Sequence, residues 1–420
     1  MTFHTTRRTL ITSLVLTSLV ALTACASSPS AEPGLEPGPG QESSAVPHGF
    51  VAGATEADEA QVRLSYLSAD SGAITMIDPL TGEEGFSTAV PGATSLSHDG
   101  RYIFVRTTPN APLKMIDTGV WTRAHGDHSH FYSAAAHTVE TDSPLPSGSA
   151  RGDGNKVAIF DESTGTTSVL LREALDKGDV HVALSIPGTP HTGLAVPYKG
   201  HVLVTGAPGG DQLPTTVSVF DNAGASESLT NAACPSLRGH AITSYGVLFG
   251  CSDGVLIVSD DTGSLTAAKI PYPSTHPGTN PGERIESFGH RPGSSELTAL
   301  AGTAGLWHLD AAAQKIQFIK SPEPLVTSTT AGNGTPALAV GTSGTVYAFN
   351  TKTIAVEAQA DLLPATKTGQ TPSLVVDNNR AYLSHPGTAK IYELDYRDHL
   401  RVARTFPTST TPAQLVETGL

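Results

Sequence analysis

Short apolar segments recur along this chain, and each of them ends in a polar turn. One unit has a Pro, Gly or His start, a strand of small apolar residues, a Gly, Asp or Asn turn, and a second apolar strand. The unit is found at 189–204, 239–249, 334–349 and 371–383. Runs of β-branched and aromatic residues bounded by turn residues predict β-strands. No long amphipathic helix is evident, so we expect an all-β protein.

The length of the repeated unit indicates which all-β fold to expect. Each unit holds about four strands over about 40 to 50 residues, which is the period of a β-propeller blade. Because one blade cannot bury both of its faces, blades close into a ring. The opening strands predict eight blades, or seven if the short third unit is misread, and they fall near Ala93, Ser149, His191, His240, His290, Ala337, Ser373 and Ala413. A pair of β-sandwiches is the alternative fold.

The two ends of the folded region predict how the ring closes. Residues 411–416 repeat an opening strand and the chain then stops, whereas the region from 49 onward begins with strand-like segments at 62–67, 73–77 and 86–90. We therefore expect a propeller domain over 49–420, with its C-terminal strand completing the first blade.

The first 48 residues read as an export signal and a tether. Arg7 and Arg8 precede an apolar run at 9–20, and Leu-Thr-Ala-Cys at 22–25 forms a lipobox. We expect a signal peptide over 1–24, a lipidated Cys25, and a flexible Pro/Gly/Ser linker over 25–48. An ordinary signal peptide or a membrane-spanning helix is the alternative, although the apolar run is short for a span. The expected location is extracytoplasmic, at the outer face of the cell membrane and held there only by lipid.

The net charge of the chain limits the kinds of partner that it can attract. The chain has 25 Lys and Arg against 39 Asp and Glu, a formal net charge of −14. Such a balance argues against nucleic acid or anionic lipid as a partner and favours a cation.

Beyond Cys25, the remaining cysteines are Cys234 and Cys251. We expect a disulfide between them in an oxidising compartment. A metal pair is the alternative, but the spacing is not that of a zinc knuckle.

The richest cluster of metal-binding residue types lies at 125–130. It contains His125, Asp127, His128 and His130, with Gly126 to permit a tight loop. Imidazole nitrogens are good zinc ligands, and a carboxylate can bind the metal or orient a ring. The alternative is an exposed polar loop between the third and fourth strands of the second blade.

A second set of histidines lies where the innermost strands begin. His191 and His240 open adjacent predicted blades, His290 lies one blade further, and His385 is a weaker candidate. Side chains at these positions can point into a central channel and converge. The alternative is that each histidine packs singly at a blade edge. This set and the 125–130 loop are expected on opposite faces, which allows two separate metal sites.

Motifs for catalysis are missing from the sequence. It contains no Gly-x-Ser-x-Gly elbow, His-Glu-x-x-His helix, phosphate loop or dinucleotide fingerprint. We therefore expect that the protein is not an enzyme. A lactonase-type propeller hydrolase, whose catalytic residues would be dispersed, is kept as a less favoured alternative.

Several segments resemble the AztD-type periplasmic zinc metallochaperones. They are 125–132 (His-Gly-Asp-His-Ser-His-Phe-Tyr), 190–193, 234–240, 249–255, 49–54 and 61–66. The resemblance covers nearly all of the folded chain. It implies a propeller that binds zinc and passes it to the solute-binding protein of a zinc ABC importer. It also implies that His125, Asp127, His128 and His130 are loop ligands and that His191 matches a histidine at a blade start.

The chain departs from that family pattern at the blade starts. His191-Thr192-Gly193 stands where the family has His-His-Gly, and Arg238-Gly239-His240-Ala241 stands where it has His-Gly-Glu-Ala. The central site is therefore either remodelled, with His240 replacing a lost ligand, or lost.

These features together predict a lipid-tethered, monomeric zinc chaperone. Neutral imidazoles would hold Zn²⁺ and release it to the solute-binding protein by ligand exchange. Cu²⁺ is the alternative metal, because imidazole sites bind it more tightly than zinc. A propeller that binds a surface protein or glycan without any metal is the alternative function.

Overall fold

Strands of this protein form where the sequence concentrates β-branched and aromatic residues. A computed structural model describes residues 49–420, except 109–110, 210–211, 261–262 and 275–282. The predicted signal peptide, Cys25 and the linker lie outside the described residues. No helix within the described ranges is long and apolar enough to cross a membrane.

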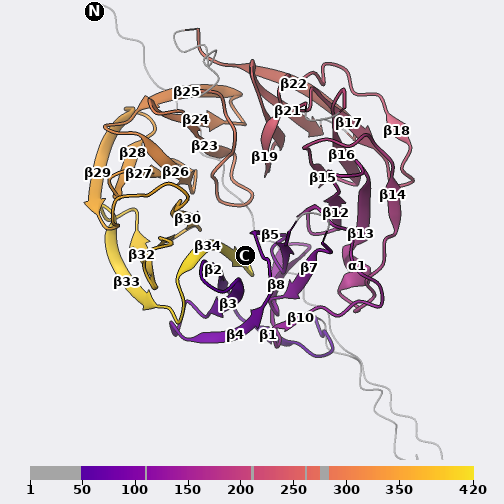
Figure 1. Ribbon diagram of the computed structural model, residues 1–420, viewed down its shortest axis with the longest axis horizontal. Coiled ribbons are helices and arrows are strands. Elements are labelled where there is room, and N and C mark those ends of the chain that lie inside the picture. Colours follow the sequence, from indigo (N-terminus) through magenta and orange to yellow (C-terminus); the bar gives the residue numbers. More distant parts are fainter. Residues whose placement is uncertain (1–48, 109–110, 210–211, 261–262, 275–282) are drawn as a thin grey trace, which may run out of the picture. The chain divides into compact units, whose positions relative to one another are not determined.

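The first four sheets of the ring are antiparallel and four-stranded (Figure 1). The first sheet contains β34 (Pro412–Thr418), β2 (Arg63–Ser68), β3 (Ala73–Ile77) and β4 (Glu84–Ala89). The second contains β5 (Ser95–His98), β6 (Tyr102–Arg106), β7 (Lys114–Asp117) and β10 (His137–Thr138). The third contains β11 (Ser149–Gly152), β12 (Lys156–Phe160), β13 (Thr167–Leu171) and β14 (Leu184–Ile186), with the short helix α1 (Arg172–Leu175) after β13. The fourth contains β15 (Ala195–Tyr198), β16 (His201–Gly206), β17 (Thr216–Phe220) and β18 (Ser226–Glu227).

The second half continues the same arrangement. The fifth sheet contains β19 (Arg238–Thr243), β20 (Gly246–Cys251), β21 (Gly254–Asp260) and β22 (Leu265–Pro271). The sixth contains β23 (Glu296–Ala301), β24 (Gly305–Asp310) and β25 (Lys315–Lys320). The seventh contains β26 (Leu325–Thr330), β27 (Ala337–Gly341), β28 (Thr345–Asn350) and β29 (Ala355–Asp361). The eighth contains β30 (Ser373–Val376), β31 (Ala381–Ser384), β32 (Lys390–Asp395) and β33 (Arg401–Pro407).

The core of residues 49–420 lies between neighbouring sheets, which stand around a ring in Figure 1. Inner strands are apolar on both faces because each is covered by a sheet on either side, and all six residues of β20 are buried. Outer strands keep contact with water, and β17 alternates exposed and buried positions. The all-β, propeller-like fold expected from the sequence is therefore confirmed.

The two ends of the folded region lie side by side. β34 pairs antiparallel with β2, from Arg63 opposite Thr418 onward. Tyr66 of the first sheet also shares one buried cluster with Tyr382 and Phe406 of the eighth. Burying aromatic side chains of this size stabilises the contact by about 1.5–3 kcal/mol each.

Two details differ from the sequence prediction. The opening strand predicted near Ala337 is wrong, because Ala337 begins β27, the second strand of its sheet. The first strand is β26, whose Leu-Val-Thr-Ser-Thr-Thr sequence carries few apolar residues to reveal it. In addition, β15 begins only at Ala195, so His191 lies in the turn before the strand.

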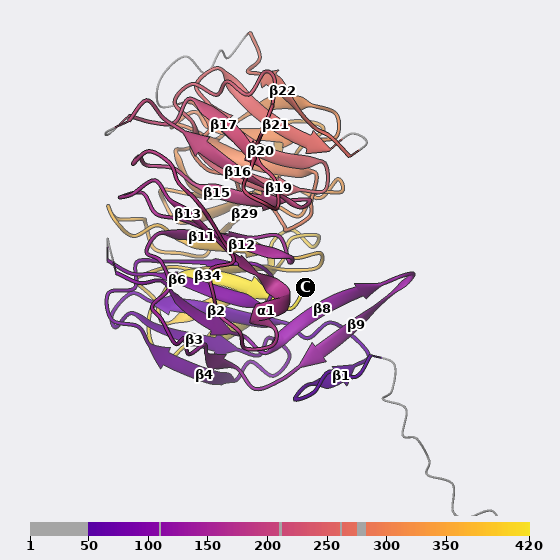
Figure 2. The ribbon, with the colours of Figure 1, turned by 90° about the vertical axis from the view of Figure 1, so that its right-hand side faces the viewer.

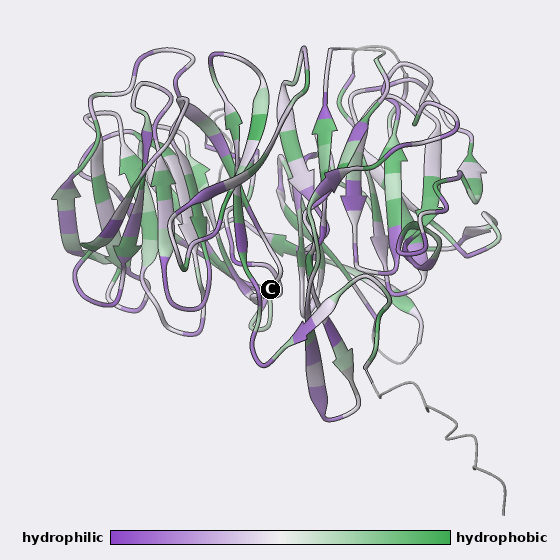
Figure 3. Ribbon diagram, turned by 90° about the horizontal axis from the view of Figure 1, so that it is seen from below, coloured by the Kyte–Doolittle hydropathy of each residue, from purple (hydrophilic) through white to green (hydrophobic). Residues whose placement is uncertain are grey.

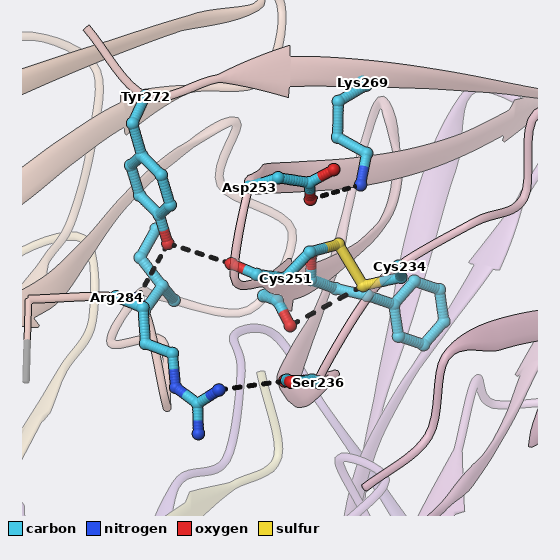
Figure 4. Close-up of a disulfide and its surroundings, with 10 residues drawn as sticks. Cys234, Ser236, Cys251, Asp253, Lys269, Tyr272 and Arg284 are labelled. Carbon is cyan, nitrogen blue, oxygen red and sulfur yellow. Dashed lines mark hydrogen bonds and ion pairs between the residues drawn. A yellow bond between two sulfur atoms is a disulfide. The ribbon is translucent and has the colours of Figure 1, made fainter. Parts of the chain in front are cut away.

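The predicted disulfide is confirmed. Cys234 and Cys251 are bonded, with an S–S distance of 2.06 Å. Figure 4 shows Tyr272 beside the bridge, where its hydroxyl donates to the Cys251 carbonyl at 3.2 Å and accepts from the Ile285 amide at 2.8 Å. The bridge therefore ties the segment before β19 to the far end of β20.

A ninth sheet stands apart from the other eight. It consists of β1 (Thr55–Ala57), β9 (His128–Ser133) and β8 (Val120–His125). The β8–β9 hairpin is inserted between β7 and β10, the place where the sequence predicted a loop, and it projects well beyond the ring sheets (Figure 2). Figure 3 shows that the projecting hairpin is hydrophilic toward its turn.

Candidate metal site on the projecting hairpin

Aromatic stacking anchors the base of the β8–β9 hairpin. Trp121 on β8 stacks on Tyr132 on β9, with their ring centroids 5.1 Å apart. The Arg101 guanidinium lies 3.7 Å from the Trp121 ring centroid and forms an ion pair with Asp117 at 2.6 Å. The Tyr132 hydroxyl donates to the Gly49 carbonyl at 2.7 Å. These contacts fix the hairpin to the second sheet, so its outer half is presented on a rigid base.

The register of the hairpin brings the histidine segment to its tip. His130 pairs with Arg123 and His128 pairs with His125, which leaves Gly126 and Asp127 as a two-residue turn. Gly126 has a φ of 60°, a left-handed conformation that glycine adopts without steric cost. The side chain of His125 is outside the described part of the molecule.

The rings of His128 and His130 meet edge-on. Their Nε2 atoms are 3.1 Å apart, and the ring centroids are 4.8 Å apart. His130 lies against Glu56 on β1, with Nδ1 and Oε1 2.5 Å apart, and His128 lies against Asp127, with Nδ1 and Oδ1 3.0 Å apart. Each histidine is thus positioned by a carboxylate through its Nδ1 atom.

These contacts determine the chemistry of the two Nε2 atoms. An ionised carboxylate only accepts hydrogen bonds, so each Nδ1 carries the hydrogen and each neutral ring has its lone pair on Nε2. Two lone pairs 3.1 Å apart repel each other unless a cation lies between them. A metal ion between the two rings would remove this repulsion.

The spacing is compatible with zinc. Two nitrogen ligands about 2.05 Å from a tetrahedral zinc ion are about 3.3 Å apart. The observed separation of 3.1 Å is close to that value. No group of three or more His, Cys, Asp or Glu side chains in the described ranges is arranged to hold a metal ion. The pair therefore offers two nitrogen atoms, fewer than the four ligands of a structural zinc site.

The side chains of His128 and His130 differ strongly in their exposure to solvent. The His130 side chain is 9% exposed and its partner Glu56 is 43% exposed. The His128 side chain is 50% exposed and its partner Asp127 is 99% exposed. The hydrogen bond from His128 lowers the pKa of Asp127. His130 thus holds its Nε2 atom in a fixed, buried position, and His128 holds its Nε2 atom within reach of solvent.

The close approach of the N-terminal backbone explains why glycine stands at 49. A Cβ atom at Gly49 would lie 2.8 Å from Glu56 Oε2 and 2.9 Å from His130 Nδ1. Gly49 also has a φ of 84°, which disfavours other residues. The start of the domain therefore covers the Glu56–His130 pair.

His191 does not join a metal cluster in the described residues. It is buried in the turn before β15, and its Nδ1 atom donates to the Thr189 carbonyl at 2.7 Å. Its Nε2 atom lies 3.0 Å from Thr205 Oγ1, and its ring meets Phe160 edge-on. Both ring nitrogens thus lie against protein oxygen atoms, so His191 packs singly at a sheet edge.

His240 lies within β19, in a different environment from that of His191. Its Nε2 atom accepts a hydrogen bond from Arg151 Nε at 3.1 Å. Burial, then the nearby Arg151 charge and then His290 hold the pKa of His240 well below its usual value. Because a guanidinium occupies the lone pair of His240, this contact does not support zinc binding at Nε2.

Two residues in these sites were missed by the sequence prediction. Glu56 lies 74 positions before His130 and in a three-residue polar strand, so no spacing rule connects the two. Arg151 lies in the opening strand β11, where only histidines were considered. A basic residue near the start of a predicted inner strand was the available signal for Arg151.

Comparisons with known proteins agree with the predicted resemblance. No family model matches the chain. The zinc chaperone AztD of Citrobacter koseri is 26% identical over 222 residues, which are 51% of this chain and 52% of that protein. The chain therefore matches about half the length of this curated relative, which carries the name of a chaperone and not that of an enzyme.

Solved structures extend the likeness in fold over most of the chain. The structure of apo AztD from Citrobacter koseri has a TM-score of 0.73 and 20% identity to this chain. The match covers 86% of this chain and 99% of the AztD chain. A second crystal structure of Citrobacter koseri AztD has a TM-score of 0.74 with the same identity and coverage. At this identity the structures establish the fold alone. With the curated relative, they confirm the resemblance to the AztD-type proteins.

Proposed function

We propose that this chain, which is similar to the AztD-type zinc chaperones, binds Zn²⁺ on the β8–β9 hairpin and passes it to another protein. The observation that carries the proposal is the pair of Nε2 atoms 3.1 Å apart, each on a ring positioned by a carboxylate at Nδ1. A carboxylate at Nδ1 fixes the tautomer and makes the other nitrogen a stronger metal ligand. We infer that His125, opposite His128 in the register, supplies a third nitrogen.

The difference in exposure suggests how zinc would be released. His130, held by Glu56, would keep its position while the exposed His128, positioned by Asp127 at the tip, is replaced by ligands of the receiving protein. Ligand exchange at an exposed tip avoids transferring a free ion through water. The same nitrogens would bind Cu²⁺, so the metal has to be decided by measurement.

The partner and the location form part of the same proposal. We propose delivery to the solute-binding protein of a zinc ABC importer, by a monomeric, extracytoplasmic lipoprotein anchored through Cys25. A flexible linker over 25–48 would keep the hairpin near the membrane and raise its effective concentration beside an importer. The AztD likeness and the lipobox at 22–25 support this arrangement.

We further propose that residues 49–420 are one domain, an eight-bladed propeller closed in its first blade. Support comes from the eight ring sheets of the described chain and from the pairing of β34 with β2. The cluster shared by Tyr66, Tyr382 and Phe406 supports packing of the eighth blade on the first.

Calorimetric titration of the metal-free protein with Zn²⁺, Cu²⁺ and Ni²⁺ tests the proposed metal site. We expect zinc binding tighter than micromolar, and loss of that binding in a His128→Ala, His130→Ala double variant. His181→Ala is a matched control, because His181 is also exposed and also contacts a carboxylate, Asp179, through Nδ1 at 2.8 Å. Binding that is weaker than micromolar, or that survives the double variant, would refute the hairpin site. A metal-free interaction propeller would show no binding in any variant.

A further inference from the structure

Arg151 is a positive charge that the fold holds without a matching carboxylate. It lies on β11, the innermost strand of the third sheet, and is half-buried. Its Nε donates to His240 Nε2 at 3.1 Å, and its Nη1 donates to the Ala150 carbonyl at 2.6 Å. Neither contact is with a carboxylate, and within the described part of the chain Arg151 forms no ion pair, although the whole protein has a net charge of −14.

The contact between Arg151 and His240 lies on the inner side of the ring. Arg151 belongs to the third sheet and His240 to the fifth, and the sheet of β15 stands between them (Figure 1). A side chain that reaches past an intervening sheet has to pass along its innermost edge. His98 on β5 and His290, next to the Gly289 bridge to β23, also lie at inner edges.

The hydrogen bonds around Arg151 assign donors to the neighbouring rings. His240 accepts at Nε2, so its Nδ1 carries the hydrogen when the ring is neutral. His98 accepts from the Gly100 amide at Nδ1, so its Nε2 carries the hydrogen. His290 donates from Nε2 to the Ile242 carbonyl at 3.2 Å. The N–H group of His290 is thus already used on a carbonyl, and none of the three rings supplies negative charge.

Electrostatics leave this positive charge uncompensated. Burial, and then repulsion from Arg106, lower the pKa of Arg151 to about 10. Arg106 itself is neutralised by Glu162 at 2.8 Å. A partly desolvated guanidinium without a counter-ion is unfavourable, and a bound anion would reduce that cost. Arg151, His98, His240 and His290 all remain partly exposed, so solvent reaches them.

We propose that the inner edge of the ring binds a small carboxylate anion on Arg151. The Nη1–Nη2 side of the guanidinium is a planar pair of donors, which matches the two oxygens of a carboxylate. This site is distinct from the hairpin and does not involve zinc.

Titration of the metal-free full chain with succinate tests the proposal, with sulfate as the second probe. We expect succinate to bind saturably and to raise the thermal unfolding midpoint. We expect Arg151→Gln to weaken binding at least about tenfold, since a charge-assisted bidentate pair is lost. Arg151→Lys keeps the charge but not the planar fork and should bind succinate with intermediate affinity. Arg401→Gln is the control, because Arg401 is exposed on β33 and carries the same charge.

Further readouts separate binding from a merely structural role. Removing an uncompensated charge should leave the midpoint of the ligand-free Arg151→Gln protein unchanged or higher, whereas loss of a structural arginine would lower it. Zinc titration of Arg151→Gln should match that of the unsubstituted protein, so failure here is distinguishable from failure of the hairpin site. Absence of saturable succinate binding, or equal binding by Arg151→Gln, would overturn the proposal. Equal affinity for sulfate, with full affinity in Arg151→Lys, would overturn the carboxylate assignment.

Discussion

Replacing Glu56 by Gln should weaken zinc binding more than replacing the carboxylate at the tip. Glu56 Oε1 lies 2.5 Å from Nδ1 of His130, whose side chain is 9% exposed. The substitution keeps the shape of the side chain but removes the charge that strengthens Nε2 as a ligand. Loss of an orienting carboxylate typically costs about 10–100-fold in metal affinity, or about 1.4–2.7 kcal/mol. Asp127→Asn should lose much less, because Asp127 is 99% exposed and water screens its charge.

Competition with a chromophoric zinc chelator measures both affinities under one condition. Thermal unfolding of each metal-free variant shows that the fold is retained, so that a change in affinity can be assigned to the site. The reasoning fails if Glu56→Gln binds zinc as tightly as the unsubstituted protein. It also fails if Asp127→Asn loses more affinity than Glu56→Gln, because Asp127 would then be a direct ligand and His128 would not need it at Nδ1.

Three further predictions concern the backbone, the disulfide and pH. Gly49→Ala should weaken zinc binding in the chelator assay, because its Cβ would crowd the carboxylate and imidazole beneath it. Gly53→Ala is the control, because Gly53 has a similar φ of 81° and nothing within 4 Å of the added atom. Replacing Cys234 and Cys251 with Ser should lower the free energy of unfolding by about 3 kcal/mol in urea titrations; an unchanged value would show that the bridge adds no stability. Burial, and then the nearby Asp377, raise the pKa of Glu417 to about 9 from 4.5. The contribution of the protonated Glu417 to stability is complete below pH 4.5 and is lost as the pH rises toward 9. Glu417→Gln should therefore stabilise the protein at pH 9 and change its stability little at pH 4. The same difference in stability between variant and parent at both pH values would contradict this.

The strands were predictable because most of them are short apolar runs ended by turn residues. The segment expected at 73–77 is β3 (Ala73–Ile77), and the one expected at 62–67 is β2 shifted by one residue. β26 was missed because four of its six residues are Thr or Ser. β1 was missed because a polar three-residue strand has no hydrophobic period. Packing between neighbouring sheets, which the sequence does not display, keeps such strands in place.

The candidate site was predictable only where its residues are local in sequence. His128, Asp127 and His130 are close along the chain, and the hairpin register brings them together at its tip. Glu56 reaches His130 only because β1 pairs with β9. His191 and His240 look equivalent in sequence, yet one lies in a turn before its strand and the other within β19. A residue's position relative to the start of a strand decides which way its side chain points, and local patterns place strand ends only to within a few residues.

The two sites prefer ligands of opposite charge because groups of opposite charge contact their imidazoles. On the hairpin, carboxylates lie behind His128 and His130, so the outward nitrogens favour a cation. At the inner edge of the ring, the guanidinium of Arg151 faces His240, so the same side chain favours an anion nearby. If a metal had to lie on the lone pair of His240, Arg151 would first have to move away and leave its charge buried. Histidine content alone therefore does not identify a metal site in this fold. The charge of the group that contacts each imidazole is the better guide. It favours a metal site on the hairpin over one at the inner edge of the ring of sheets.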